Sequence, residues 1–315
     1  MTLRLGVIGF SEGNGHPFSF SAIVNGYDDV AFADCGWDGI HAYLKKRPPE
    51  AFGFADVRVS ACWMPDPEMA IALARACKIE AVCDAPSAMY GMVDAVLILR
   101  DDAESHLPLA RMFLDTGLPV FVDKPLCLDH ETLAAFEPYL RSGQLMSCAG
   151  LRYAGELDAW RAAPRQFGDI KLIRGAVVVD WPRYGIHMLE AAMGALPGMI
   201  QPVAIRRHEA DHDSLAIRLA SGGIFLIDAL GLAAKAFRLD VFGSETHGAV
   251  DMSDNFTAFH RVLAAFIEQV RTGRPAIPPE ETLLVIRTII AGLQAQPGGP
   301  EIDIVPSGAI APSAK

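Results

Sequence analysis

Short apolar segments alternate with helical segments through the first 124 residues, and this alternation is the strongest constraint on the fold. The apolar segments have the length and β-branched content of buried strands. They cover residues 3–10, 57–63, 79–82, 95–99 and 120–124. Because parallel strands joined by a crossover helix form right-handed βαβ units, the pattern predicts a Rossmann-type, doubly wound parallel sheet.

The last of these strands ends in a lysine. In the run from Val120 to Leu126, an apolar strand is followed by Asp123, Lys124 and Pro125. Proline lacks a backbone donor and ends the strand, so we expect the lysine to be held at the edge of the sheet. Open α/β sheets bind their ligands at the carboxyl ends of their strands, and Lys124 is therefore the first candidate site residue.

The pattern changes after residue 150. Strands now follow one another with turn signals between them, which favours antiparallel pairing. They are predicted at residues 170–179, 204–207, 215–219, 223–228 and 238–242. Helices are predicted at residues 66–78, 107–116, 129–142, 187–193, 256–272 and 280–295. We expect a Rossmann-type domain of residues 1–150, an α+β domain of residues 151–305 on an open, mainly antiparallel sheet, and a mobile tail of residues 306–315.

The composition excludes several classes of partner. The formal net charge is −11, whereas binding to nucleic acid or to an anionic membrane needs a basic face. The sequence has no apparent signal peptide and no bilayer-length apolar stretch, so we predict a cytoplasmic protein with a small-molecule partner. Six cysteines without a CxxC pair indicate buried free thiols. We interpret the cluster His208, Asp211, His212 and Asp213 as a solvated turn and predict no metal site.

A glycine-bearing loop follows the first strand. Such a loop can bring backbone N–H groups against a pyrophosphate. The usual G-x-G-x-x-G pattern is incomplete, because Gly9 is followed by Ser11 and Asn14 at the second and third glycine positions. The candidate cofactor-binding residues of this loop are Gly9, Phe10, Ser11, Asn14, Gly15 and His16. Residues 18–54 then hold the first helix and an unusual insertion.

Several motifs occur in a specific order along nearly the whole chain. They are Asp123-Lys124-Pro125, His106 after the fourth strand, Arg152-Tyr153, Gly185-Ile186-His187, and Gly273-Arg274-Pro275 followed by Glu280-Glu281. In this order the sequence resembles the Gfo/Idh/MocA family of sugar oxidoreductases. The resemblance implies hydride transfer between a nicotinamide cofactor, NAD or NADP, and a sugar, inositol or related polyol.

The resemblance also assigns residues. It implies that His187 is the base for the hydroxyl proton and that Lys124 is the cation that steadies the oxyanion. Further candidates near this chemistry are Arg183 and Tyr184. Further cofactor candidates are Trp63, Met64, Arg100, Asp101, His106 and Asp123, in addition to Lys124. The candidate substrate residues are Arg152, Tyr153, Asp180, Trp181 and Glu190.

Two positions depart from the family pattern. Arg183 stands where the family has an aspartate, so Asp180 or Glu190 could replace that carboxylate, or Arg183 could bind an acidic substrate. Met64 stands where an acid usually holds the cofactor ribose. Asp34 could be that acid only if the second strand were residues 30–35. The choice between NAD and NADP therefore stays open.

Alternative functions remain on the same fold. One is a lyase, hydrolase or epimerase that holds its cofactor tightly, and another is a ligand sensor or scaffold without catalysis. Strands such as residues 176–179 and 224–227 show little polar alternation. Both faces of the second sheet are therefore expected to be covered, which predicts a homodimer or homotetramer through that sheet.

Overall fold

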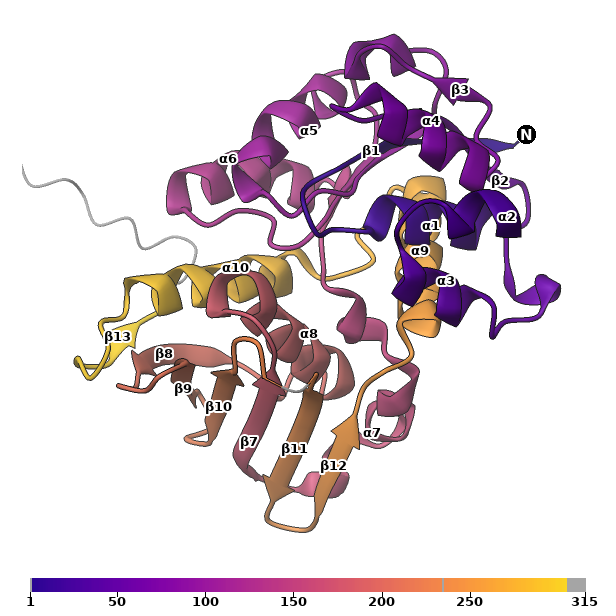
Figure 1. The fold of residues 1–315 in the computed structure, drawn as a ribbon. Coiled ribbons are helices and arrows are strands. Elements are labelled where there is room, and N and C mark those ends of the chain that lie inside the picture. Colours follow the sequence, from indigo (N-terminus) through magenta and orange to yellow (C-terminus); the bar gives the residue numbers. More distant parts are fainter. Residues whose placement is uncertain (1, 234, 305–315) are drawn as a thin grey trace, which may run out of the picture. The chain divides into compact units, whose positions relative to one another are not determined.

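The computed structural model describes residues 2–233 and 235–304, which form two compact units (Figure 1). The first unit comprises Met1–Cys127, Ala135–Cys148 and Asn255–Ile277, and the second comprises the other described residues. Residues 255–277 thus belong with the Rossmann-type unit, although the sequence pattern placed them in the second domain. The predicted tail of residues 306–315 lies outside the described residues.

The first unit is built on a six-stranded parallel sheet with the order β3-β2-β1-β4-β5-β6. Its strands are β1 (Leu3–Ile8), β2 (Val57–Trp63), β3 (Ala81–Val82), β4 (Ala95–Ile98), β5 (Val120–Val122) and β6 (Leu145–Met146). The strand order reverses between β1 and β4, which is where open α/β sheets bind their ligands. The predicted doubly wound parallel sheet is confirmed.

The helices of this unit follow the strands as a βαβ pattern requires. They are α1 (His16–Asn25), α2 (Asp29–Ala33), α3 (Asp38–Leu44), α4 (Pro67–Ala76), α5 (His106–Leu114), the C-terminal part of α6 (His130–Arg141), and α9 (Asn255–Thr272). Helix α9 packs through aromatic rings. Phe259 lies 5.0 Å from Phe20 of α1, and Phe266 lies 5.9 Å from Phe121 of β5, measured between ring centroids. These contacts explain why α9 belongs to the first unit.

The insertion between α1 and β2 is mostly helical. It contains α2, α3 and a short 3₁₀ turn at Pro49–Ala51. Asp34 is the C-cap of α2 and not the end of a strand, so β2 is the segment 57–63, as predicted. Trp37 and Ile40 lie so close to Gly15 that a Cβ at residue 15 would overlap both side chains. The insertion therefore covers part of the loop that follows β1.

The second unit is built on a seven-stranded sheet with the order β12-β11-β7-β10-β9-β8-β13. Its strands are β7 (Ile170–Val177), β8 (Pro202–Arg207), β9 (Asp213–Leu219), β10 (Ile224–Ala229), β11 (Phe237–Gly243), β12 (His247–Asp251) and β13 (Ile302–Asp303). Only β7 and β10 pair in parallel among these described strands. The predicted open, mainly antiparallel sheet is confirmed.

Helices α8 (Ile186–Ala195) and α10 (Pro279–Gln294) lie on one side of this sheet, and the short helix α7 (Asp158–Ala162) precedes β7 (Figure 1). The contact of α8 with β7 is tight, because a Cβ on Gly175 would lie 2.9 Å from Met188. On the opposite side of β7, where side chains alternate, Leu172 is partly exposed. Among the described residues, no helix combines the length and apolar character that a membrane span needs.

Candidate functional site

The loops after β1 and β4 meet at the carboxyl edge of the first sheet. Ser11 follows β1, and its hydroxyl donates to Oδ1 of Asp101 at 2.5 Å. The backbone N–H of Asp101 donates back to the Ser11 Oγ at 3.0 Å. These reciprocal bonds hold two predicted cofactor residues together at the point where the strand order reverses.

Asp123 is the centre of a buried network at the same edge. Its Oδ2 lies 2.6 Å from Nδ1 of His16 and accepts a 3.0 Å hydrogen bond from Nδ2 of Asn14. Its Oδ1 accepts from the backbone N–H of Lys124 at 2.8 Å. Burial raises the pKa of Asp123, but His16, Lys124 and Asn14 lower it more strongly. The resulting pKa lies well below the usual range, so this carboxylate is charged.

Lys124 follows directly, at the end of β5. Only 5% of its surface is exposed, and its Nζ lies 3.7 Å from Oδ2 of Asp101. The Lys124–Pro125 peptide bond is cis. A buried ammonium beside a carboxylate keeps one position, so it can bind a reacting oxygen without reorganisation. The structure therefore places Lys124 at the sheet edge, as its sequence context predicts.

His106 and Arg100 make hydrogen bonds within the loops that follow β4 and β5. The His106 ring is fully buried, with Nδ1 3.0 Å from the Leu126 carbonyl oxygen and Nε2 2.9 Å from the Arg100 carbonyl oxygen. The Arg100 guanidinium donates to Asp102 at 2.8 and 2.6 Å. These polar atoms hold the loops after β4 and β5, and a role of the two side chains in cofactor binding stays a prediction.

Among the described residues at the end of β2, no carboxylate is available to bind a ribose. Met64 is 2% exposed, and its Cε would lie 3.2 Å from a Cβ on Gly9. Asp66 is used as the N-cap of α4, where it accepts from Glu68 N at 2.9 Å. Trp63 is partly buried. The acid that usually binds the adenosine ribose therefore has no equivalent here.

The loop after β1 fits a nucleotide in part. Gly13 has a φ of +80°, and a Cβ there would meet no atom within 4 Å, so the backbone at this residue is open. Phe10 contacts Trp37 of the insertion edge to face, with ring centroids 6.3 Å apart. The first helical N–H of α1, on His16, is already bound by Asn14 Oδ1 at 2.9 Å. Ser11, Lys124 and the open loop backbone are the groups that fit the cofactor.

In the second unit, the predicted base His187 lies in the first turn of α8. It is 9% exposed, and its ring contacts Tyr184 and Phe237 at centroid distances of 5.3 and 5.9 Å. Tyr184 is partly buried. The structure thus brings the two predicted residues His187 and Tyr184 together on one aromatic wall.

Arg183 and Asp180 bind each other. The Arg183 guanidinium donates to Asp180 Oδ2 at 2.7 and 3.0 Å, and the Arg183 backbone N–H donates to Oδ1 at 3.0 Å. Asp180 is thereby the N-cap of a π-helical turn, Trp181–Gly185. Because Arg183 already balances its charge, Asp180 is poorly suited to replace the missing family aspartate beside His187.

Three predicted substrate residues are internal. Trp181 is fully buried, and its Nε1 donates to the Ile289 carbonyl oxygen at 2.9 Å. Arg152 donates to Glu190 Oε2 at 2.7 Å and also binds Glu281. Burial raises the pKa of Glu190, and the Arg152 guanidinium opposes this effect. In the structure these side chains bind one another or the backbone inside the unit, and their role as substrate residues stays a prediction.

Three further residues bear on the candidate site: Tyr153, Trp37 and Asp213. Tyr153, which follows Arg152 in the sequence, is partly buried. Sequence reasoning missed Trp37, whose only signal was its place after a glycine in an aromatic insertion. It also interpreted Asp213 as part of a solvated turn. Within the described residues, no group of three His, Cys, Asp or Glu side chains is arranged to hold a metal ion.

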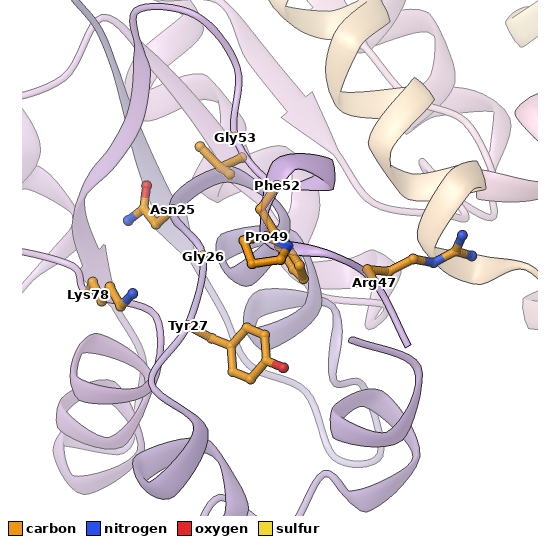
Figure 2. Close-up of a pocket in the computed structure, with 9 residues that line it drawn as sticks. Asn25, Gly26, Tyr27, Arg47, Pro49, Phe52, Gly53 and Lys78 are labelled. Atoms are coloured by element: carbon orange, nitrogen blue, oxygen red, sulfur yellow. The ribbon is translucent and has the colours of Figure 1, made fainter. Parts of the chain in front are cut away.

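A cavity of about 410 Å³ lies elsewhere in the first unit (Figure 2). Its walls include Tyr27, Phe52 and Lys78. Because α1 begins at the carboxyl edge, its last turn, which borders this cavity, lies toward the opposite edge of the sheet. The Lys78 Nζ lies beside Gly26, the C-cap of α1, where it offsets the partial negative charge of the helix end. This cavity is separate from the Lys124 edge.

Comparison with known proteins agrees with this geometry. Residues 38–143 match the model of the oxidoreductase family with an NAD-binding Rossmann fold. Over these residues, about a third of the chain, the sequence is similar to the Gfo/Idh/MocA family. This similarity supports the predicted class of enzyme, an NAD(P)-dependent oxidoreductase, and the predicted nicotinamide cofactor.

Three similar proteins extend the comparison. A candidate UDP-kanosamine synthase oxidoreductase subunit of Amycolatopsis mediterranei (strain S699) is 28% identical over 155 residues, which are 49% of this chain and only 41% of that protein. A candidate myo-inositol dehydrogenase from Sinorhizobium meliloti 1021 has a TM-score of 0.75 and 19% identity, and the alignment covers 96% of this chain and 100% of that one.

The third is scyllo-inositol dehydrogenase from Lactobacillus casei, solved with NAD(H) and scyllo-inositol. Its TM-score is 0.74 at 13% identity, and the alignment covers 96% of this chain and 99% of that one. At these identities the two solved structures show that the two-domain Gfo/Idh/MocA fold is shared.

Proposed function

We propose that this oxidoreductase transfers a hydride between a nicotinamide cofactor and a carbon of a sugar, inositol or related polyol. The observation that carries the proposal is the buried Lys124 at the carboxyl end of β5. Its ammonium is 3.7 Å from Asp101, which is bound to Ser11 of the loop after β1. A fixed cation at this edge suits an alcohol oxygen that gains negative charge as the hydride leaves.

The bound cofactor would supply the nicotinamide ring that accepts or donates the hydride. In this proposal, Ser11 and the open backbone at Gly13 hold the cofactor in the first unit. Lys124 binds the reacting oxygen and stabilises its charge. The resemblance to the family assigns the hydroxyl proton to His187, since an imidazole can act as a base near neutral pH. Tyr184 orients the imidazole through its ring contact.

The proposed substrate class has two sources of support. Similar folds occur in proteins named as inositol dehydrogenases. The curated relative has a name that refers to a nucleotide-linked amino sugar. The test panel should therefore contain myo- and scyllo-inositol, free hexoses and UDP-hexoses, each with NAD and with NADP.

The first experiment is to measure NADH and NADPH binding to the folded protein by fluorescence, followed by turnover of the panel. We expect Lys124→Met and His187→Asn to lower kcat by about a hundredfold or more, since each removes one proton- or charge-handling group. Lys171→Met, at an exposed lysine of β7, is the matched control and should leave kcat unchanged. Folded protein that binds neither NADH nor NADPH would refute the proposal.

The same binding and turnover measurements distinguish a dehydrogenase from the alternative, a lyase, hydrolase or epimerase. Such an enzyme would be purified with cofactor already bound and would show no net reduction of added cofactor. The homo-oligomer and the cytoplasmic location stay predictions.

A further inference from the structure

The turn that leads to His187 has an unusual backbone. Residues Trp181–Gly185 form a π-helical turn, which is rare and is often found at functional sites. Val179, just before it, has a φ of +67°, a conformation that is strained for a β-branched residue. Its N–H and carbonyl groups are paired with Gly231 at 2.8 and 3.0 Å. Such strain persists only where surrounding contacts hold the backbone.

Asp213 of β9 holds the first residue of this turn. Its Oδ2 accepts a 2.8 Å hydrogen bond from the Trp181 backbone N–H. This N–H belongs to the start of a helical turn and therefore has no partner within the helix. Arg207 of β8 binds the other oxygen, Oδ1, of the same carboxylate. Arg207 thus holds one oxygen of the Asp213 carboxylate, and the other oxygen holds the start of the turn.

The Trp181 side chain leaves the turn little freedom. Its indole ring lies between two glycines, Gly185 and Gly292, and a Cβ at either position would overlap the ring. Its Nε1 donates to the Ile289 carbonyl oxygen of α10 at 2.9 Å. Two hydrogen bonds therefore fix the position of Trp181: its backbone N–H donates to Asp213, and its indole N–H donates to the backbone of α10. His187 follows six residues later, in the first turn of α8.

We propose that Asp213, oriented by Arg207, is a positioning residue for His187. The inference rests on the proposed function, in which His187 is the base. Loss of the Asp213 carboxylate would free the Trp181 N–H, relax the strained turn and change the direction of the imidazole. A small displacement of a catalytic group lowers the rate strongly, because proton transfer needs an aligned geometry.

The neighbouring carboxylate provides a matched control. The Asp211 side chain is 99% exposed, whereas that of Asp213 is 21% exposed. The Asp211 carboxylate pairs with the exposed neighbour His212, at 2.8 Å from its Nδ1. The two aspartates lie in one segment and carry the same charge, so a general electrostatic effect would appear in both variants. An effect through the turn would appear only at residue 213.

The test compares Asp213→Ala, Asp213→Asn and Asp211→Asn by steady-state kinetics and by hydrogen exchange of the amides of residues 181–187. For Asp213→Ala we expect kcat to fall at least tenfold, with the Kd of NADH within twofold of wild type, and faster exchange in the turn. Asp213→Asn keeps one acceptor oxygen and should recover part of kcat. Asp211→Asn should match wild type in both measurements.

Unchanged kcat and unchanged exchange in a folded Asp213→Ala protein would overturn the inference. If the wild type turns over no substrate, the proposed function fails, and exchange alone then decides whether Asp213 holds the turn. Should Asp213→Ala not fold, Arg207→Met removes only the cation that orients the carboxylate. That variant should show an intermediate rise in exchange, and wild-type exchange in it would refute the role of Arg207.

Discussion

Nδ1 of His16, the first residue of α1, lies 2.6 Å from a carboxylate oxygen of Asp123, which directly follows β5. The Asp123 side chain is 3% exposed and that of His16 is 20% exposed, so the pair is largely shielded from water. It joins the loop after β1 to the strand end that carries Lys124. The electrostatic state of the candidate cofactor edge therefore depends on a contact between residues 107 positions apart.

The Asp123 network should make the protein sensitive to acid. The folded-state pKa of Asp123 lies well below its value in an unfolded chain, which is about 3.9. A lowered folded pKa stabilises the protein above the unfolded pKa, and this contribution is lost as the pH falls below about 4. We expect Asp123→Asn to lower the free energy of unfolding at pH 7 by about 3 kcal/mol and to flatten its acid dependence, as measured by urea unfolding.

Asp115→Asn is the control for this prediction. The pKa of Asp115 is also lowered, by its hydrogen bond from Tyr139, but this side chain is 45% exposed and is screened by water. Its variant should follow the wild-type acid profile. A wild-type profile for Asp123→Asn as well would show that the network does not stabilise the fold.

Removal of the Arg152 cation from the buried triad with Glu190 and Glu281 should strongly lower the free energy of unfolding. Arg152→Met leaves Glu190 without its counter-charge in a site that is 1% exposed. Breaking such a pair typically costs about 3–5 kcal/mol, whereas Arg218→Met, which breaks an exposed pair with Glu301, should cost under about 1 kcal/mol.

The pH dependence identifies the cause of that loss. With its pKa raised by burial, Glu190 binds more protons in the folded state than in the unfolded state. Stability of Arg152→Met should therefore fall as the pH rises from about 5 to 8, and Glu190→Gln in the same background should remove that slope. A pH-independent loss would instead indicate a packing defect.

Cofactor discrimination should be weak. A carboxylate at the end of β2 normally accepts the ribose hydroxyls and repels a 2′-phosphate, but here Met64 is buried against Gly9. We expect the Kd values of NADH and NADPH to agree within about tenfold, which is 1.4 kcal/mol. Asp66→Asn, which can still cap α4, should leave both values unchanged. A hundredfold preference, lost in Asp66→Asn, would show that Asp66 binds the ribose.

The uncovered face of the second sheet should be an interface between copies of the chain. Ile224, Leu172 and Phe242 are paired in register across β10, β7 and β11, and Ile224 and Phe242 are 43% and 40% exposed. Light scattering should show a dimer or tetramer that Ile224→Lys shifts toward monomer, because burial of lysine without a partner is costly. Ile71→Lys, at another exposed isoleucine, is the control. A monomeric wild type would contradict this assembly.

The sequence allowed the layers of both units to be predicted because their strands are short, apolar and regularly spaced. Residues 57–63 could be recognised as β2 because Asp66 and Pro67 mark the start of the next helix. The position of α9 could not be predicted in this way. Its amphipathic pattern shows that one face is buried but does not identify the aromatic surface of Phe20 and Phe121 that covers it.

The candidate site was predictable where backbone topology decides the position of a side chain, as for Lys124 after β5. The site could not be predicted where a polar side chain has several possible hydrogen-bond partners inside the unit. Trp181 and Arg152 stand in motif positions that resemble a substrate site, yet each is satisfied inside the unit. Asp213 shows the reverse case, because a sequence cluster does not reveal which of two nearby aspartates is turned inward.

The return of α9 to the first unit also affects how the chain can be synthesised and divided. A fragment that stops at residue 150 would lack Phe259 and Phe266 and would expose the rings of Phe20 and Phe121 to water. During translation, the nucleotide-binding half cannot complete its core until residue 277 has left the ribosome. The parallel sheet must therefore wait for most of the second unit to be made, and neither half can be transplanted as one continuous segment.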